Sequence, residues 1–113
     1  MVTVETVRTL ALALPQAEEA LSSGTPAWKV GRRLFAHLSA DGESLAVKAS
    51  KSARAALSTA EPDKYTVGGE QAGARMVVVR LAKVEPPELR EVLTQAWRSS
   101  APRRLVKLFD AGQ

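Results

Sequence analysis

The chain of 113 residues contains no cysteine, which excludes disulfide bonds, thiolate metal sites and a cysteine nucleophile. It contains one histidine, His37, too few to supply the several imidazole ligands that a metal site needs. The sequence also has no Gly-x-Ser-x-Gly nucleophile elbow, no carboxylate pair of recognisable spacing and no glycine-rich loop that leads into a helix. We therefore expect a protein that is not an enzyme and has no cofactor.

Long apolar runs are also missing, and no segment approaches the roughly 18 residues of a membrane span. Glu5 and Arg8 interrupt the N-terminal segment, and no basic stretch precedes it, unlike a signal peptide. Aromatic residues make up only 4% of the chain, so the core must be built mainly from Leu, Val and Ala. These features predict one cytoplasmic domain over residues 1–113, without membrane contact, and a monomer is the favoured oligomeric state.

Acidic residues are outnumbered, with 12 Asp and Glu against 16 Lys and Arg. The formal net charge is +4 and the sequence pI is about 9.9. A basic chain suits an acidic partner such as nucleic acid or an anionic surface. An arginine-rich proteome produces the same balance without any such partner, so the position of the charges decides between the two.

Periodicity predicts a helix over residues 3–14, capped by Thr3 and ended by Pro15. The polar stretch of residues 16–26 is expected to be a connection. Apolar alternation predicts strands over residues 27–30, 34–38 and 44–48, joined by turns at Gly31 and at Asp41-Gly42. The later elements are a helix over residues 50–58, a short strand over 65–67, a loop over 68–74, a strand over 76–81, a helix from Pro87 and a final helix from about 103.

The order of these elements is α-β-β-β-α-β-β-α-α. Strands that follow one another closely, with helices at either side of them in the chain, indicate the α+β class. We expect an antiparallel sheet of about four to five strands with the helices packed on one face.

Strict alternation divides the side chains of each strand between the two faces of the sheet. One set is apolar and suits the core: Trp28, Val30, Leu34, Ala36, Leu38, Leu45, Val47, Val77, Val79 and Leu81. The opposite set contains Lys29, His37, Lys48 and Arg80, with Phe35 nearby. None of the 12 acidic residues falls within these predicted strands. The basic face is either an ordinary solvated face with lysines that oppose edge aggregation, or a surface for an anion.

Several stretches resemble the MmcQ/YjbR family of small bacterial proteins. They are "GTPAWKVGRRLFAHL", "LAVK" at residues 45–48 and the ending "ELREVLTQAWRSSAPRRLVKLFD". The resemblance implies a domain similar to the bacterial frataxin fold, and DNA binding through a double wing of β-hairpins. The first wing would be the hairpin of residues 29–38, with Arg32 and Arg33 at its tip, and the second would be residues 68–76, with Arg75.

We therefore predict a protein that binds nucleic acid, in particular DNA, weakly and with little sequence preference. Phosphates would be contacted by Arg32 and Arg33 at the hairpin tip, by Arg75 on the second wing, and by Lys29, Lys48 and Arg80 on the sheet. The alternative is a non-catalytic module that binds a small ligand or a protein on the same sheet face. Iron binding, which the frataxin likeness suggests, is disfavoured because the first predicted helix carries one carboxylate, Glu5.

Overall fold

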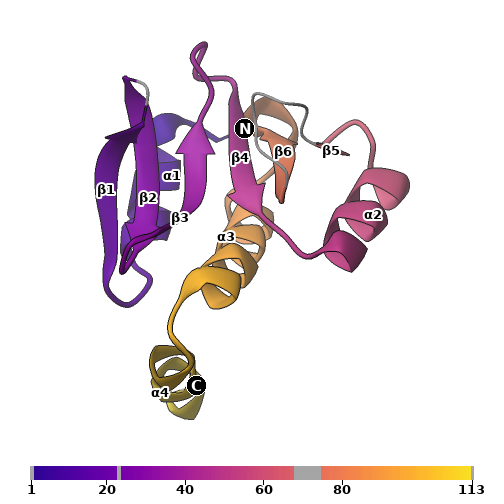
Figure 1. Ribbon diagram of the computed structural model, residues 1–113. Helices are drawn as coiled ribbons and strands as arrows, with labels where there is room; N and C mark the ends of the chain where they lie inside the picture. Colours follow the sequence, from indigo (N-terminus) through magenta and orange to yellow (C-terminus); the bar gives the residue numbers. More distant parts are fainter. Residues whose placement is uncertain (1, 23, 68–74, 113) are drawn as a thin grey trace.

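A computed structural model describes residues 2–22, 24–67 and 75–112. The helices are α1 (Val4–Leu12), α2 (Lys51–Ala60), α3 (Pro86–Ser100) and α4 (Arg103–Ala111), with a short 3-10 helix η1 (Leu81–Lys83). The strands are β1 (Ala17–Ser22), β2 (Thr25–Val30), β3 (Arg33–Leu38), β4 (Ser44–Lys48), β5 (Tyr65–Val67) and β6 (Met76–Arg80). They form one antiparallel sheet in the order β1-β2-β3-β4-β6-β5, which confirms the α+β class with one strand more than the upper expectation (Figure 1).

Two helices begin with a side-chain cap, and the sequence predicts the one at Thr3. The backbone N–H of Thr6 donates to Thr3 Oγ1 at 3.4 Å, and the N–H of Ala53 donates to Ser50 Oγ at 3.1 Å. Each side chain satisfies an amide that the first helical turn leaves without a partner. α3 starts with two prolines, whose fixed φ suits a first turn. These residues therefore fix the points in the sequence at which α1, α2 and α3 begin.

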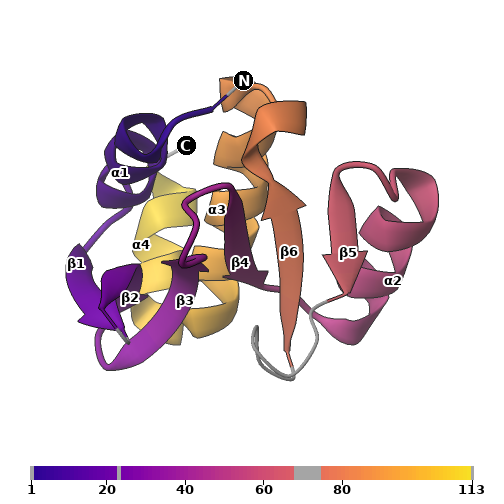
Figure 2. The ribbon, with the colours of Figure 1, turned by 90° about the horizontal axis from the view of Figure 1, so that it is seen from above.

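α1 and α3 cover one face of the sheet, and none of the described helices lies on the other face (Figures 1 and 2). The core lies between these layers, and its largest buried side chains include Trp28, Phe35 and Val47 from the sheet and Leu93 and Trp97 from α3. Trp97 Nε1 donates to the carbonyl of Pro15 at 2.9 Å, so the connection after α1 is tied to α3. We call the uncovered side of the sheet the open face.

The stretch predicted as a connection contains β1, one of the two edge strands of the sheet. Its backbone pairs with β2 from Ala17 opposite Val30 to Ser22 opposite Thr25. Strand pairing outweighs the weak local preference of a Glu- and Ala-rich segment. The strand also brings Glu18 and Glu19 into the sheet, whereas the strands predicted from the sequence contain no acidic residue. Glu19 lies on the helix side, and Glu18 is opposite Lys29 on the open face.

A β-bulge in β3 overturns the predicted faces of two residues. Trp28 is opposite Ala36, whereas the next residue, Lys29, is opposite Leu34, so Phe35 is the extra residue of the bulge. Phe35 and Ala36 are both fully buried in the core. Leu34 therefore lies on the open face, where it packs with Ala46, Met76 and Val78. Strict alternation predicts the reverse, with Leu34 inward and Phe35 outward, and is wrong for these two residues.

Two glutamates join separate layers by hydrogen bonds. Glu19 on β1 accepts from Arg8 Nε of α1 at 2.7 Å and from the indole N–H of Trp28 at 3.2 Å. Glu88 on α3 accepts from Lys64 Nζ at 3.1 Å and from the hydroxyl of Tyr65 at 3.0 Å. The hydrogen bond from Arg8 lowers the pKa of Glu19. Burial alone would raise the pKa of Glu88, but the bonds from Lys64 and Tyr65 outweigh it, and the net shift is downward.

The free energy of unfolding should therefore fall in acid. A carboxyl whose folded pKa is lowered contributes its full stabilisation above its ordinary pKa of 4.5. That contribution is lost as the pH falls below 4.5 through the lower folded pKa. Urea unfolding between about pH 3 and 7 checks this, and the Glu88→Gln variant should show a shallower acid loss than the native chain. Equal acid dependence in the two proteins would contradict the role given to Glu88.

Candidate nucleic-acid interface

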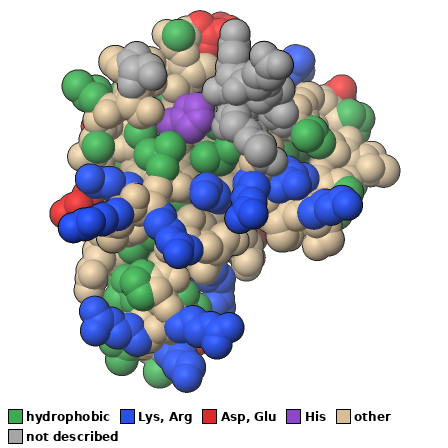
Figure 3. Space-filling view, viewed as in Figure 1, with side chains coloured by type: hydrophobic (Ala, Val, Ile, Leu, Met, Phe, Trp, Pro, Cys, Tyr) green, Lys and Arg blue, Asp and Glu red, His purple; other side chains and the backbone are tan. Residues whose placement is uncertain are grey.

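The middle of the open face is a small apolar area around the only histidine. Cross-strand pairing aligns Ala27, His37, Ala46, Val78 and Thr66 in one row from β2 to β5. His37 is partly exposed and is visible on this face (Figure 3). Within the described residues its side chain makes no hydrogen bond that would activate or orient it, so it has no acid-base partner there.

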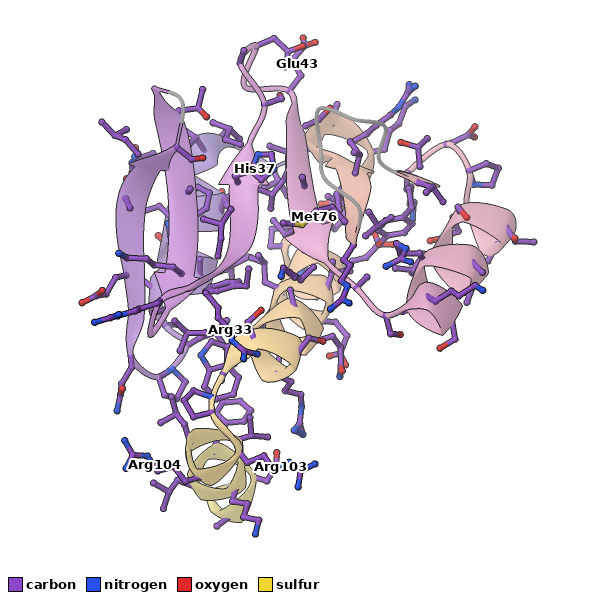
Figure 4. All side chains as sticks on the ribbon, in the orientation of Figure 1. Arg33, His37, Glu43, Met76, Arg103 and Arg104 are labelled. Atoms are coloured by element: carbon purple, nitrogen blue, oxygen red, sulfur yellow. The ribbon has the colours of Figure 1, made fainter. Side chains whose placement is uncertain are left out.

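Arg32 and Arg33 are both exposed at the β2–β3 turn. The turn begins with Gly31 at φ 64°, and Arg32 has no positive φ. Glycine at the first central position followed by a residue of negative φ is the pattern of a type II′ hairpin turn. Arg32 is within the turn, and Arg33 is opposite Val30, so the register puts Arg33 at the helix-side edge of the sheet end. Figure 4 shows Arg33 at the end of β3 opposite to the turn that carries Glu43.

The next strands place further cations at the same end of the hydrogen-bond ladder. Lys48, the last residue of β4, is opposite Met76, and the N–H of Ala49 donates to the carbonyl of Arg75 at 3.0 Å. α2 then adds Lys51 and Arg54, and Arg54 Nη1 donates to the carbonyl of Ala49 at 2.8 Å. With those of β2 and its turn, these cations form what we call the basic belt: Lys29, Arg32, Arg33, Lys48, Lys51, Arg54 and Arg75. Figure 3 shows Lys and Arg side chains in a row across the lower part of the sheet.

Arg80 is on the open face, as predicted, but it is separated from the belt. It is opposite Ser44, whereas the belt residue Lys48 is opposite Met76 at the other end of the same ladder. Four steps along a strand correspond to about 14 Å. Asp41 and Glu43 belong to the turn at the end where Arg80 lies, so the sheet is basic at one end and carries acidic residues at the other.

None of the belt residues forms an ion pair with the part of the chain that the structure describes. The ion pairs found there use Arg8, Lys64 and Arg98, which bind glutamate or aspartate side chains. Glu18 faces Lys29 across the β1–β2 ladder without forming an ion pair. The belt cations therefore have no ion-pair partner among the described residues and can bind an external anion, as can cations outside the belt such as Lys83 and Arg90.

The predicted second wing falls mostly on residues 68–74, which lie outside the described residues. Arg75 ends it and is exposed, next to Met76 at the belt end of the ladder. The segment predicted as the first wing forms the β2–β3 hairpin, with Arg32 and Arg33 at its turn. Sequence reasoning missed Lys51 and Arg54 as neighbours of these residues. Their position in the sequence could have indicated this. α2 begins three residues after β4 ends, so its first turn must lie near that end of the strand.

The aromatic side chains are all directed away from the open face. Trp28, Phe35, Tyr65 and Trp97 are buried, and Phe109 of α4 packs on Trp97 with ring centroids 5.0 Å apart. Base stacking by Trp28, which the sequence left open, is therefore excluded in this conformation. Among the residues that the structure describes, no three His, Asp or Glu side chains gather in a group that could hold a metal ion. No described helix is both long and apolar enough to cross a membrane.

Fold and surface together define a class of small α+β domains with helices on one face of an antiparallel sheet and a basic belt along one end of that sheet. The chain belongs to the YjbR family, whose family model matches residues 12–99. It is 32% identical over 100 residues to the uncharacterized proteins Rv2570 of Mycobacterium tuberculosis and Mb2600 of Mycobacterium bovis, with 73% of this chain and 78% of each relative covered. The crystal structure of Deinococcus radiodurans protein DR2400, a DUF419 domain, is similar with a TM-score of 0.73 and 25% identity, over 84% of this chain and 75% of that one.

Proposed function

We propose that the protein binds nucleic acid, DNA in particular, weakly and largely without sequence preference. The observation that carries this is the basic belt, a row of seven Lys and Arg side chains without ion pairs in the described part of the chain. Cations that neutralise phosphates release bound counterions, and this supplies affinity that does not depend on base sequence. The Arg side chains can also hold a phosphate by two parallel hydrogen bonds.

Two features favour contacts to the sugar-phosphate backbone over contacts to bases. Proteins that hold single strands stack bases on exposed aromatic rings, and here four of the five aromatic side chains are buried. α3, the longest helix, packs against the sheet through Leu89, Leu93 and Trp97, so it is not free to enter a groove. A binder of this kind should hold a duplex at least as well as a single strand.

The alternative is a non-catalytic module that binds a protein or a small molecule on the same face. The apolar cluster of Leu34, Ala46, Met76 and Val78 is the observation that favours it. Apolar contacts respond little to ionic strength, whereas phosphate contacts weaken steeply, so salt dependence separates the two functions. Neither function gives His37 a catalytic role.

The test is fluorescence anisotropy of the native chain with a labelled 20-base-pair duplex and with a single strand of equal length, across salt. With three to five phosphates contacted, the slope of log K against log salt should be about −3 to −4.5 for the duplex. Shuffled duplexes should bind within about threefold of one another. Absence of binding at about 20 mM salt, or a slope near zero, would overturn the proposed function.

A further inference from the structure

The last helix, α4, carries a second group of cations outside the basic belt. Arg103, Arg104 and Lys107 are all exposed, and none of them forms an ion pair with the part of the chain that the structure describes. The one acidic residue of the helix, Asp110, is occupied by Arg98 of α3, whose Nη1 donates to Asp110 Oδ1 at 2.7 Å. We call the three cations the α4 patch.

The arrangement of the α4 patch is unfavourable for the helix itself. Arg103 and Arg104 are in the first turn, where the helix dipole has its positive end and acidic residues are preferred. Arg103 and Lys107 are four residues apart, so two like charges are neighbours on the same side of the helix. The N-cap residue, Pro102, provides no side-chain hydrogen bond. A bound polyanion would relieve this repulsion, which no ion pair within the described chain does.

Apolar packing holds α4 in place despite this repulsion. Leu105 is buried, and Phe109 packs on Trp97 of α3 with ring centroids 5.0 Å apart. Helical periodicity puts these apolar side chains on the side opposite to Arg103 and Lys107, so the α4 patch faces away from α3. A partner that binds the patch therefore meets a helix that is already positioned, and little ordering is needed on binding.

The α4 patch lies beyond the end of the sheet that carries the basic belt. Figure 1 shows α4 below the lower ends of β2 and β3, and the view from above in Figure 2 shows it beneath the same strands. Figure 4 shows Arg33 at that end of the sheet, with Arg103 and Arg104 beyond it on α4. The Lys and Arg side chains of α4 are visible from the same side of the molecule as the belt (Figure 3).

We propose that the α4 patch is a second contact surface for the phosphate backbone of the DNA duplex bound at the basic belt. This inference rests on the proposed function, because it adds a contact to the same duplex. Its cations match the charge of the phosphates, and a duplex held at two places is fixed in its orientation. An anionic membrane suits the patch less well, because the apolar side of α4 is packed on α3 except for Leu108.

Fluorescence anisotropy with a labelled 20-base-pair duplex tests this in two matched double variants. Arg103→Gln with Lys107→Gln removes one Arg and one Lys from the α4 patch. Lys83→Gln with Arg90→Gln removes the same residue types from exposed positions outside the patch and the belt. The α4 variant should bind about tenfold more weakly at about 50 mM salt, with a slope of log K against log salt that is shallower by about 0.9. The control should bind within about threefold of the native chain, with an unchanged slope.

Thermal unfolding separates this binding role from a structural one. Because the replaced cations are unfavourable for the helix, the α4 variant should melt at the same temperature as the native chain or higher, although its DNA affinity falls. A lower melting temperature, or equal DNA binding by the two double variants, would overturn the second contact surface. So would a loss of affinity for phosphatidylserine vesicles without a loss for DNA. Absence of DNA binding by the native chain would overturn the proposed function as well, whereas binding that only the belt cations support would overturn the α4 contact alone.

Discussion

Phe35→Ala should destabilise the protein by about 3 to 5 kcal/mol, whereas Leu34→Ala should cost about 1 kcal/mol. Phe35 is fully buried in the core, and its removal leaves a cavity that the surrounding side chains cannot fill. Leu34 is only half-buried, in the small cluster with Ala46 and Met76 on the open face. The two losses of stability differ strongly because the bulge directs Phe35 into the core and Leu34 onto the open face.

Urea unfolding of the two variants and the native chain measures this difference. Domains of this size are commonly stable by only about 5 to 15 kcal/mol, so Phe35→Ala is expected to lower the folded fraction at 25 °C. The milder Phe35→Leu, which should cost about 1 kcal/mol, keeps the transition measurable. Strict alternation along β3 makes the opposite prediction, with Leu34 the costly position. A larger loss for Leu34→Ala than for Phe35→Ala would therefore show that the bulge is absent.

The same bulge shows why the fold was easier to predict than the faces of its strands. Caps, turns and helical periodicity are local, so the positions of α1, α2, α3 and most strands follow from short segments of sequence. A bulge depends on how two strands align, and nothing in residues 33–38 marks Phe35 as the extra residue. β2 and β4 have no extra residue, and for them alternation placed Lys29 and Lys48 on the correct face.

β1 was missed for a related reason. Its residues are Glu, Ala, Leu and Ser, and their local preference gives no strand signal. What holds the strand is the partner backbone of β2, together with Glu19, which joins Arg8 of α1 to the indole of Trp28. The site depends on strand register in the same way. Alternation along β6 predicts the correct face for Arg80, but its distance from Lys48 follows only from the register of β4 and β6.

Replacing both hairpin arginines, Arg32→Ala with Arg33→Ala, should weaken DNA binding more than any other paired removal of charge. Each cation that leaves a phosphate reduces the magnitude of the salt slope by about 0.9, so the slope of the double variant should be shallower by about 1 to 2. At about 50 mM salt the affinity should fall roughly tenfold for each phosphate that is no longer bound, and the difference from the native chain should narrow as salt rises. Stability should change little, because both side chains are exposed.

The matched control is Lys83→Ala with Arg90→Ala, which lowers the net charge by the same amount at exposed positions outside the basic belt. A protein attracted to DNA only by its overall charge would lose affinity equally in the two double variants, and its salt slopes would remain alike. A binder that uses the hairpin tip would lose slope only in the Arg32 and Arg33 variant. If the two double variants show equal affinities and equal salt slopes, overall charge alone accounts for the DNA binding of the native chain. The basic belt would then have no specific role in that binding.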